Sequence, residues 1–405
     1  MIRSITSVKV SGRRVFIRAG FDVPLKDGRV ADDARIKDAL PTLRYLIDQR
    51  AKIIIGSHLN RPNGWNETKS LWPVAEKLGE FLNYKVVKVT NKLPDYPVPH
   101  IYFFTQDITK GNYADLTRTM RGGDILMLEN LRFYPGEQEN SEEFAKALAQ
   151  FADVFVNEAF SNAHRKDASV FSLPNLLPAY AGIDFLREIQ ALNQVAQHPQ
   201  KPMVLLIGGA KISDKVETIE NLADKVDYIL VGGRVGNTFL KAAGYDVGKS
   251  ETEDEVIAKH LLRNYKNKIV LPADLVVAKS VDDVPRAVTP DKIRPTDIIL
   301  DIGPASIRKF SQLLKSAKTL VWNGPFGVIE KPKFAFGSKG LAQAFASRSK
   351  GQAFGLVGGG ETVELIHQAK VEQFIDHIST AGGAMLEFLS GKQLPAIKAL
   401  ERNNA

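Results

Sequence analysis

The sequence predicts an α/β fold in which parallel β-sheets are flanked by helices. Short apolar runs alternate with longer segments of helical periodicity along the 405 residues, which is typical of repeated β-α-β units. This length suggests two or three domains. The predicted strands of the first half end at basic or polar loops, whereas those of the second half end at glycine. We therefore expect two lobes that present different chemistry to a ligand.

The composition excludes several classes of protein. The chain contains no cysteine, which excludes disulfides, thiolate metal sites and a cysteine nucleophile, and which is consistent with a reducing, cytoplasmic environment. Its first ten residues, MIRSITSVKV, contain no apolar core of a signal peptide, and no run of 18 apolar residues occurs. We expect neither a signal peptide nor a membrane span.

The net charge of +8 indicates an anionic ligand. The basic residues are interspersed with acidic ones and form no arm or tail. Neither an RNA-binding aromatic signature nor zinc-finger spacing occurs. We therefore expect a small polyanion as the ligand, and no nucleic acid.

Basic side chains recur at the strand ends of the first half. In open α/β sheets ligands bind at the carboxyl ends of the strands, and arginine suits planar recognition of carboxylate and phosphate. Each cation alone could be a solvated surface group, but together they predict a site for a small ligand with several negative charges. The strand-like runs are Val15–Arg18, Ile53–Gly56, Ile125–Leu128 and Val154–Val156. The cations are Arg18, Arg35, His58, Arg61, Arg132, His164 and Arg165.

The stretch Met203–Lys215, MVLLIGGAKISDK, predicts a phosphate-binding turn in the second half. Met203–Ile207 is expected to be a buried strand, and either Ser213 or Asp214 is expected to cap the following helix. A glycine turn before a helix lets backbone N–H groups approach an anion, and Lys211 and Lys215, four residues apart on one face, would add two charges. The alternative is an ordinary connection with solvated lysines.

Six predicted strands of the second half end at glycine in this way, including the one before GGGET, Gly358–Thr362. There a carboxylate and a hydroxyl stand at a predicted helix start. A carboxylate beside a phosphate is typical of Mg²⁺ sites, although Glu361 could instead only complement the helix dipole. Glu330, after the WNGPFGV turn, could accept hydrogen bonds from a ribose or could simply be exposed.

Other motifs are absent or misleading. The segment Ala243–Ser250, AGYDVGKS, fits a relaxed phosphate-loop pattern, but a helical segment precedes it where the motif requires a strand. Ser250 and Glu253 instead predict a capping box for the next helix. No HExxH, GxSxG or clear GxGxxG motif occurs, so direct transfer between two bound anions is simpler than covalent catalysis.

The boundary between the lobes is expected near Ala181-Gly182, after the proline-rich segment FSLPNLLPAYAG. Ile183–Gln197 is predicted to be one long helix that links the lobes. We expect residues 1–182 to form the first lobe and residues 183–390 the second. The tail, residues 391–405, could pack back on either lobe.

The motifs together resemble those of the phosphoglycerate kinase family over nearly the whole chain. Eight of them occur in the family's order: DDARIKDALPT, SHLNRPNG, LMLENLRFYPGE, NAHRKDAS, GGAKISDK, VWNGPFGVIE, GGGET and STAGGAMLE. The resemblance implies two Rossmann-like lobes joined by a helix and a hinge, with the tail, residues 391–405, packing back on the first lobe. It also implies a monomer that reversibly transfers a phosphoryl group between 1,3-bisphosphoglycerate and MgADP, giving 3-phosphoglycerate and MgATP by closure of the lobes.

The resemblance assigns site residues by motif. It implies that the phosphoglycerate is bound by Arg18, Gly20, Phe21, Asp22, Arg35, His58, Leu59, Asn60, Arg61, Arg132, His164 and Arg165. It implies that ATP or ADP is bound by Gly208, Gly209, Lys211, Lys215, Gly232, Gly233, Gly303, Asn323, Pro325, Val328, Glu330, Gly358, Gly359, Gly360, Glu361 and Thr362. The implied ligand of Mg²⁺ is Glu361. The implied catalytic residues are Arg35, Lys211, Lys215, Gly382 and Gly383.

Two departures from the family pattern fall in the segment RAGFDVP. Gly20 stands where aspartate is usual, and Asp22 stands where asparagine is usual. Residues two apart in an extended segment face the same side, so Asp22 could partly replace the lost carboxylate. It would also place negative charge closer to an anionic ligand.

Four further departures lie in the two lobes. Asn60 and Arg234 each replace a usual glycine, and Ala381 replaces the first glycine of a usual triplet. Arg234 would narrow the base pocket or add a cation to it. Glu361 replaces the usual aspartate, which shifts the carboxylate at a metal that requires octahedral geometry.

These departures leave two alternatives open. The chain could be a non-catalytic descendant that binds nucleotide or phosphoglycerate as a sensor, or a two-lobed kinase for a related acid. The presence of Lys211, Lys215 and the expected arginines favours the phosphoglycerate kinase reaction.

Overall fold

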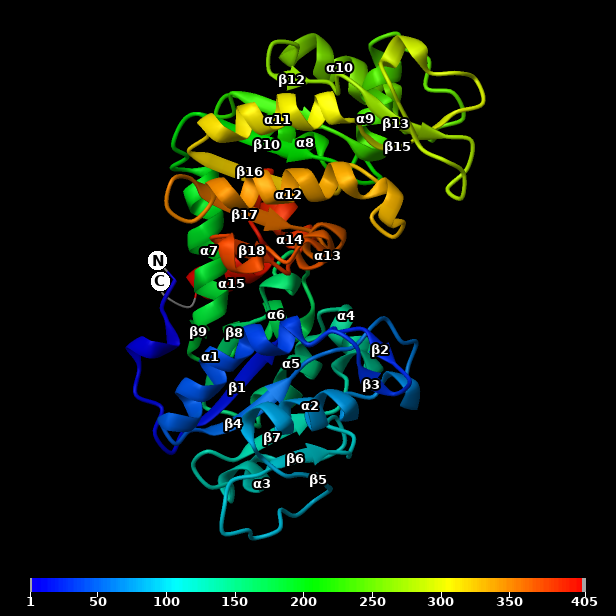
Figure 1. Cartoon of the computed structure of the whole chain (residues 1–405). Helices are drawn as coiled ribbons and strands as arrows, with labels where there is room; N and C mark the ends of the chain where they lie inside the picture. Colours follow the sequence, from blue (N-terminus) through cyan, green and yellow to red (C-terminus); the bar gives the residue numbers. More distant parts are fainter. Residues whose placement is uncertain (1, 403–405) are drawn as a thin grey trace. The chain divides into compact units, whose positions relative to one another are not determined.

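The computed structural model describes residues 2–402 and confirms the predicted α/β class. The chain divides into two compact units (Figure 1): unit 1 runs to Ile189 and resumes at Gln393, and unit 2 runs from Gln190 to Lys392. Among the described residues, no helix is both long and apolar enough to cross a membrane.

Unit 1 is built on a seven-stranded sheet whose strand order is β5-β6-β7-β4-β1-β8-β9. All of its neighbouring strands pair in parallel. The strands are β1 (Arg14–Ala19), β4 (Lys52–Gly56), β5 (Val86–Val89), β6 (Ile101–Phe104), β7 (Ile125–Leu128), β8 (Val154–Glu158) and β9 (Ala179–Ala181). A short hairpin, β2 (Leu25–Lys26) and β3 (Arg29–Val30), follows β1.

The central strands of unit 1 form because their side chains are apolar on both faces. Val15, Phe16 and Ile17 of β1 and Ile53 to Ile55 of β4 are fully buried, as expected for a parallel sheet covered by helices. Their carboxyl ends therefore meet at one edge, where the basic loops begin.

Helices of unit 1 flank this sheet (Figure 1). The helices of the unit are α1 (Ala34–Asp48), α2 (Trp72–Leu82), α3 (Ala114–Arg118), α4 (Pro135–Gln138), α5 (Glu142–Ala149), α6 (Ala168–Phe171) and α15 (Pro395–Arg402). Helix α7 (Ile183–Ala196) begins in unit 1 and ends in unit 2. Helix α15 belongs to unit 1, where the Ala396 amide donates a hydrogen bond to the Ala163 carbonyl at 3.1 Å.

A buried carboxylate holds the start of α7. Glu158, the last residue of β8, accepts hydrogen bonds from the backbone amides of Asp184 and Phe185, each at 3.2 Å, and from the Thr42 hydroxyl. These amides are among the first N–H groups of the helix, which have no partner within it. A Cβ atom at Gly182 would lie 1.8 Å from the Glu158 carboxylate, so only glycine fits between β9 and α7.

This acidic cluster makes stability depend on pH. Burial raises the pKa of Glu158 to about 7, and burial together with the charges of Asp38, Glu158 and Glu188 raises the pKa of Asp184 to about 9. The folded chain therefore holds protons that the unfolded chain releases between about pH 4 and pH 9. Its free energy of unfolding should fall as pH rises, by up to about 1.4 kcal/mol per pH unit for each such proton.

We expect Asp184→Asn to flatten this decline above pH 7, because asparagine carries no charge in either state. Urea unfolding at pH 5, 7 and 9 measures the effect, with Asp27→Asn, at an exposed position of unit 1, as the matched control. Equal pH slopes in the variant and the wild type would contradict the assignment.

Unit 2 contains two separate sheets. The larger has the order β12-β11-β10-β16-β17-β18 and is parallel throughout. Its strands are β10 (Met203–Ile207), β11 (Tyr228–Val231), β12 (Ile269–Val270), β16 (Thr319–Asn323), β17 (Phe354–Gly358) and β18 (His377–Ser379). The smaller is antiparallel and contains β13 (Leu275–Ala278), β14 (Arg286–Val288) and β15 (Ile298–Ile302). Of the six strands expected to end at glycine, the strand before Gly303 thus lies outside the parallel sheet.

The helices of unit 2 are α8 (Val216–Leu222), α9 (Gly233–Ala242), α10 (Glu255–Tyr265), α11 (Pro304–Ser316), α12 (Phe336–Arg348), α13 (Gly360–Ala369) and α14 (Gly383–Leu389).

Two capping predictions in unit 2 are wrong. Helix α8 begins after Lys215, with no side-chain cap, so neither Ser213 nor Asp214 caps it, and the two lysines lie in the turn instead of on a helical face. Helix α10 is capped by Asp254, whose carboxylate accepts from the amides of Val256 and Ile257. Ser250 instead accepts a hydrogen bond from the Ile299 amide, so it joins its loop to β15.

Candidate active site

The predicted cations of unit 1 lie in two layers. Arg18, His58 and Arg132 are almost fully buried, with at most 2% of each residue exposed. Arg61 is exposed, and Arg35, His164 and Arg165 are half-buried. The sequence predicts all seven as ligand contacts, and in the structure the first three are buried beneath the others.

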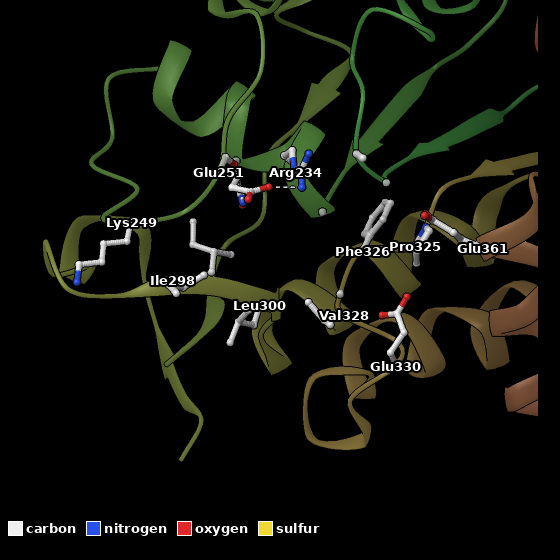
Figure 2. Close-up of a pocket in the computed structure, with 16 residues that line it drawn as sticks. Arg234, Lys249, Glu251, Ile298, Leu300, Pro325, Phe326, Val328, Glu330 and Glu361 are labelled. Carbon is white, nitrogen blue, oxygen red and sulfur yellow. Dashed lines mark hydrogen bonds and ion pairs between the residues drawn. The ribbon is translucent and has the colours of Figure 1, made fainter. Parts of the chain in front are cut away.

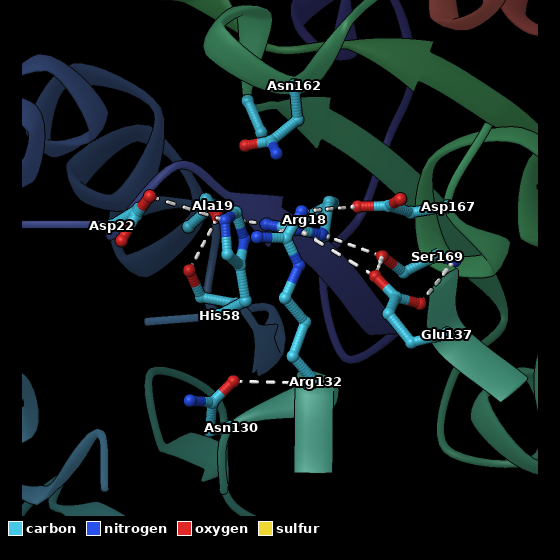
Figure 3. Close-up of polar contacts among 12 residues, drawn as sticks. Arg18, Ala19, Asp22, His58, Asn130, Arg132, Glu137, Asn162, Asp167 and Ser169 are labelled. Atoms are coloured by element: carbon cyan, nitrogen blue, oxygen red, sulfur yellow. Dashed lines mark hydrogen bonds and ion pairs between the residues drawn. The ribbon is translucent and has the colours of Figure 1, made fainter. Parts of the chain in front are cut away.

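The buried layer is a chain of contacts that begins at Glu137 (Figure 3). The Ser169 hydroxyl donates to Glu137 and accepts from Arg18 Nε at 2.7 Å, and the guanidinium of Arg18 lies 3.8 Å from the Glu137 carboxylate. Arg18 Nη2 donates to His58 Nδ1 at 2.8 Å. His58 Nε2 lies 3.6 Å from Asp22 Oδ2, so this series of contacts ends in the segment that departs from the family pattern.

This network of side-chain contacts determines the tautomer and the charge of His58. A guanidinium can only donate, so His58 Nδ1 must accept and Nε2 carries the proton toward Asp22. Burial and the charges of Arg18 and Arg132 lower the pKa of His58 to about 3, so the ring is neutral near pH 7. Burial alone would raise the pKa of Asp22, but hydrogen bonds from His58 and the Asn60 amide, with the charge of Arg35, lower it well below its usual range.

Arg132 is tied to two neighbouring loops. Its Nη2 donates to Asp167 at 3.1 Å, and its Nη1 donates to the Asn60 carbonyl at 3.0 Å. The Nε–H groups of Arg132 and Arg165 are buried without a hydrogen-bond partner in the described part of the chain. Burial and the charges of Arg132 and Arg61 lower the pKa of Arg165, so these guanidinium groups share one region. Unpaired buried donors are costly, and an anion would satisfy them.

The geometry explains one departure and constrains another. Asn60 has φ +58°, a conformation that favours glycine and that asparagine tolerates better than most residues. Its amide donates to Asp22 Oδ1 at 2.7 Å, which fixes the carboxylate. A Cβ atom at Gly20 would lie 3.0 Å from the Ser161 hydroxyl, so a side chain there would require that hydroxyl to move.

The remaining predicted residues of unit 1 differ in accessibility. Arg35, in the first turn of α1, donates through Nη1 to the Asp22 carbonyl at 2.5 Å, so its guanidinium is held beside the same segment. Phe21 and Leu59 are fully buried, backbone included. The Phe21 amide donates to the Ser57 hydroxyl at 3.0 Å, and the Leu59 carbonyl accepts from the Asn130 side chain at 2.9 Å.

Unit 2 contains a cavity of about 430 Å³ edged by glycine (Figure 2). Gly209 and Gly233 lie on one side, and Leu300, Pro325 and Val328 contribute apolar surface. Glu330 and Glu361 also line the cavity, while Lys249 and Glu251 lie at its other end. A flat apolar ring with polar edges would suit these walls.

This cavity continues into a hollow lined by both lysines. The cavity and the hollow share Gly209, Ala210 and Glu361, and the hollow is also lined by Lys211, Lys215, Gly360 and Thr362. Lys215 is 7% exposed, and its Nζ donates to the Lys211 carbonyl at 3.0 Å. Burial lowers the pKa of Lys215, although the carboxylates of Asp214, Glu361 and Glu253 oppose this.

A third hollow adjoins the lysine-lined one through Asp214, Asn323 and Gly359. Gly382 and Gly383 line it at the start of α14. The predicted catalytic glycines thus lie next to the predicted catalytic lysines within unit 2.

The loops around these hollows are fixed by buried polar groups. The Ser338 hydroxyl accepts from the amides of Phe326 and Gly327, each at 2.9 Å. Asp301 accepts from the Gly337 amide at 2.6 Å, and burial raises the pKa of Asp301 to about 7. The Gly324 amide donates to the Thr362 hydroxyl at 2.7 Å, where Gly324 has φ +91° and a Cβ atom would collide with the Gly208 backbone. These contacts join the β10, β16 and β17 loops into one rim.

Several predicted glycines do not line any of these hollows. They support the rim by close packing: Gly208 against Gly324 and Pro325, Gly232 against Phe326, Gly303 against Asp274, and Gly358 against Met385.

The assignment by motif omits the other lining residues, which are Ala210, Asn237, Lys249, Glu251, Ile298, Ile299, Leu300, Phe326 and Gly327. Lys249 lies inside the misleading AGYDVGKS segment. That segment follows helix α9, as expected, so it is not a phosphate loop, yet it reaches the cavity through its loop position.

Across residues 2–402, no group of three or more His, Asp or Glu side chains is placed to hold a metal ion. A Mg²⁺ ion that is bound together with nucleotide phosphates requires only one or two carboxylates. Glu361 lies at the junction of the cavity and the lysine-lined hollow, so its carboxylate fits such a role.

These features define a two-lobed α/β phosphotransferase, with guanidinium groups gathered in one unit and a glycine-edged cavity beside two lysines in the other. The model of the family "Phosphoglycerate kinase" matches residues 5–392. The chain therefore belongs to the phosphoglycerate kinase family.

Individual relatives agree with this assignment. The chain is 42% identical to the phosphoglycerate kinase of Pelotomaculum thermopropionicum over 98% of each chain, and 43% identical to that of Nitratiruptor sp. over 99% of this chain and 98% of the other. Its structure is similar to that of phosphoglycerate kinase from Coxiella burnetii, with a TM-score of 0.85 and 38% identity over 99% of each chain. The enzyme from Pyrococcus horikoshii gives a TM-score of 0.84 at 29% identity, over 100% of this chain and 99% of the other.

Proposed function

We propose that this chain catalyses the reversible transfer of a phosphoryl group between 1,3-bisphosphoglycerate and MgADP. In the reverse direction a carboxylate oxygen of 3-phosphoglycerate attacks the γ-phosphorus of ATP, the bond from that phosphorus to the bridging oxygen breaks, and ADP leaves. No proton has to be transferred. The protein's tasks are therefore in-line placement and stabilisation of charge on the transferring group.

The guanidinium cluster of unit 1 is the proposed site of the phosphoglycerate. Arg35, Arg61 and Arg165 reach the surface there, while the buried layer beneath them fixes the loops. The unpaired Nε–H groups of Arg132 and Arg165 are the observation that favours an anion.

The connected hollows of unit 2 are the proposed nucleotide site, and their continuity is the observation that carries the proposal. The cavity is proposed to hold the nucleoside, with the ribose at Glu330 and the base toward Ile298 and Leu300. The phosphates would then lie beside Lys211 and Lys215 and the glycine backbone at the start of α13. Bound Mg²⁺, held by Glu361, would supply positive charge to the phosphates.

Transfer requires both ligands to meet in line, so we propose that the units close during the cycle, with Gly182 and helix α7 as the hinge region. The proposed lobes are 1–182 with 391–405, for the phosphoglycerate, and 183–390, for the nucleotide, whereas the compact units meet at Ile189 and Gln393. We further propose that the chain acts as a cytoplasmic monomer, with small molecules and neither nucleic acid nor membrane as its partners.

A steady-state assay of the purified chain with 3-phosphoglycerate and MgATP tests the proposal. Turnover well above a blank without protein is expected. Absence of turnover, together with nucleotide binding measured by calorimetry, would favour the alternative of a non-catalytic sensor.

Asp22→Asn should lower KM for 3-phosphoglycerate about two- to fivefold and leave kcat nearly unchanged. Removing a charge beside an anion gains on the order of 1 kcal/mol at a partly exposed site, and asparagine keeps an oxygen for the Asn60 amide. Asp48→Asn, at an exposed end of α1, is the control. A several-fold rise in KM would instead show that the carboxylate accepts a hydrogen bond from the substrate.

A further inference from the structure

Charged side chains line the end of the cavity where the base of the nucleotide is proposed to bind, beside the apolar walls. If Glu330 and the lysine-lined hollow hold the ribose and phosphates, the base extends toward Ile298, Arg234 and Glu251 (Figure 2). This inference rests on the proposed function, because it concerns the base of the same nucleotide.

Arg234 is held in place by two carboxylates. It is the second residue of α9, its Nη2 forms an ion pair with Glu251, and its Nη1 lies 3.8 Å from Glu253. Its side chain is 39% exposed, so part of the guanidinium remains open to a ligand. An ion pair that is exposed to solvent contributes little to stability. The main effect of these ion pairs is therefore to fix the position of the Arg234 charge.

The loop that carries both carboxylates is itself fixed. The Asn237 side chain donates to the Glu251 carbonyl at 3.3 Å, and the Glu253 amide donates to the Thr238 hydroxyl at 3.0 Å. The Lys249 amide donates to the Asp297 carbonyl at 2.7 Å. Helix α9 and the loop before α10 therefore hold the guanidinium at the cavity edge before any ligand binds.

We propose that Arg234 sets the purine tolerance of this cavity and raises the use of bases with an oxygen at C6 relative to adenine. Guanine and hypoxanthine present two adjacent acceptors, O6 and N7, whose spacing matches two N–H groups of one guanidinium. Adenine presents an amino group at C6, which faces a guanidinium donor to donor. Arg234 therefore extends the nucleotides that this site accepts to 6-oxopurine nucleoside diphosphates beside ADP.

The test compares kcat/KM for MgADP, MgGDP and MgIDP, with 1,3-bisphosphoglycerate as the second substrate. The variants are Arg234→Ala, Arg234→Lys and, as the matched control, Arg263→Ala at an exposed position of α10. In Arg234→Ala we expect the GDP/ADP and IDP/ADP ratios to fall at least about fivefold. The ratios for Arg234→Lys should lie between those of the wild type and of Arg234→Ala, because an ammonium cannot donate two parallel hydrogen bonds as a guanidinium does. Arg263→Ala should keep both wild-type ratios.

Unchanged ratios in Arg234→Ala would overturn the proposal. A fall for GDP alone would also overturn it, because IDP lacks only the 2-amino group and keeps O6 and N7. Dissociation constants of the three diphosphates, measured by calorimetry without the second substrate, provide the same comparison. They separate the two hypotheses: a chain without turnover but with the expected change in affinity ratios would refute the proposed reaction and support the role of Arg234.

Discussion

Lys215→Ala should lower kcat by about two to three orders of magnitude while the fold stays intact. Removing one preorganised donor from a site where charge develops has effects of this size. Lys215 is 7% exposed, lies in the lysine-lined hollow with Glu361, and has its amine oriented by the Lys211 carbonyl at 3.0 Å. A positive charge in such a buried position acts more strongly on phosphate oxygens than one in water.

The same burial explains why the variant should fold. Lys215 is 7% exposed, so its charged amine is largely desolvated in the native state, which lowers its pKa, and removal of the amine relieves that cost. Lys315→Ala, at an exposed position of α11, is the control for loss of a lysine from unit 2. The measurements are steady-state kinetics with saturating MgATP and thermal unfolding of each variant. Wild-type turnover in Lys215→Ala would remove this residue from the site.

The sequence predicted the fold well where local patterns decide it. Apolar runs bounded by loops identified strands such as Met203–Ile207 and Ile125–Leu128 with their observed bounds, because buried parallel strands have continuous apolar composition. The antiparallel pairing of β15 could not be predicted in this way, since a run of apolar residues does not specify its partner. The caps of α8 and α10 were also wrong, because several neighbouring polar residues could each have served as the cap.

The residue types of the candidate site can be predicted from the sequence, but their accessibility cannot. Arg18 and His58 look like surface ligands in the sequence, yet both are buried. Arg18 contacts Glu137 and Ser169, residues more than one hundred positions away, and His58 contacts Arg18. Such contacts depend on the packing of several loops and leave no local signal. Lys249 and Glu251 were missed for the same reason, since a loop between two helices reaches the cavity only in the folded chain.

Arg35→Ala is expected to lower kcat/KM for 3-phosphoglycerate about 100-fold or more. Its guanidinium is half-buried and held by the Asp22 carbonyl at 2.5 Å, so it is oriented before substrate binds. Charge-assisted guanidinium contacts to phosphate or carboxylate are among the stronger hydrogen bonds in proteins, and orientation adds to their value in a transfer reaction. Arg44→Ala, at an exposed position on the same helix, should retain the wild-type value.

The division of this loss between kcat and KM decides what Arg35 does. A rise in KM with unchanged kcat would mean that the guanidinium binds substrate and transition state equally, and an equal fall in kcat and kcat/KM would mean that its contact forms only in the transition state. We expect the second pattern to contribute, because a contact with the transferring group would grow as charge develops there. Arg35→Lys should recover little, since an ammonium keeps the charge but loses the two-pronged geometry. Full recovery by lysine would show that charge alone is required at this position.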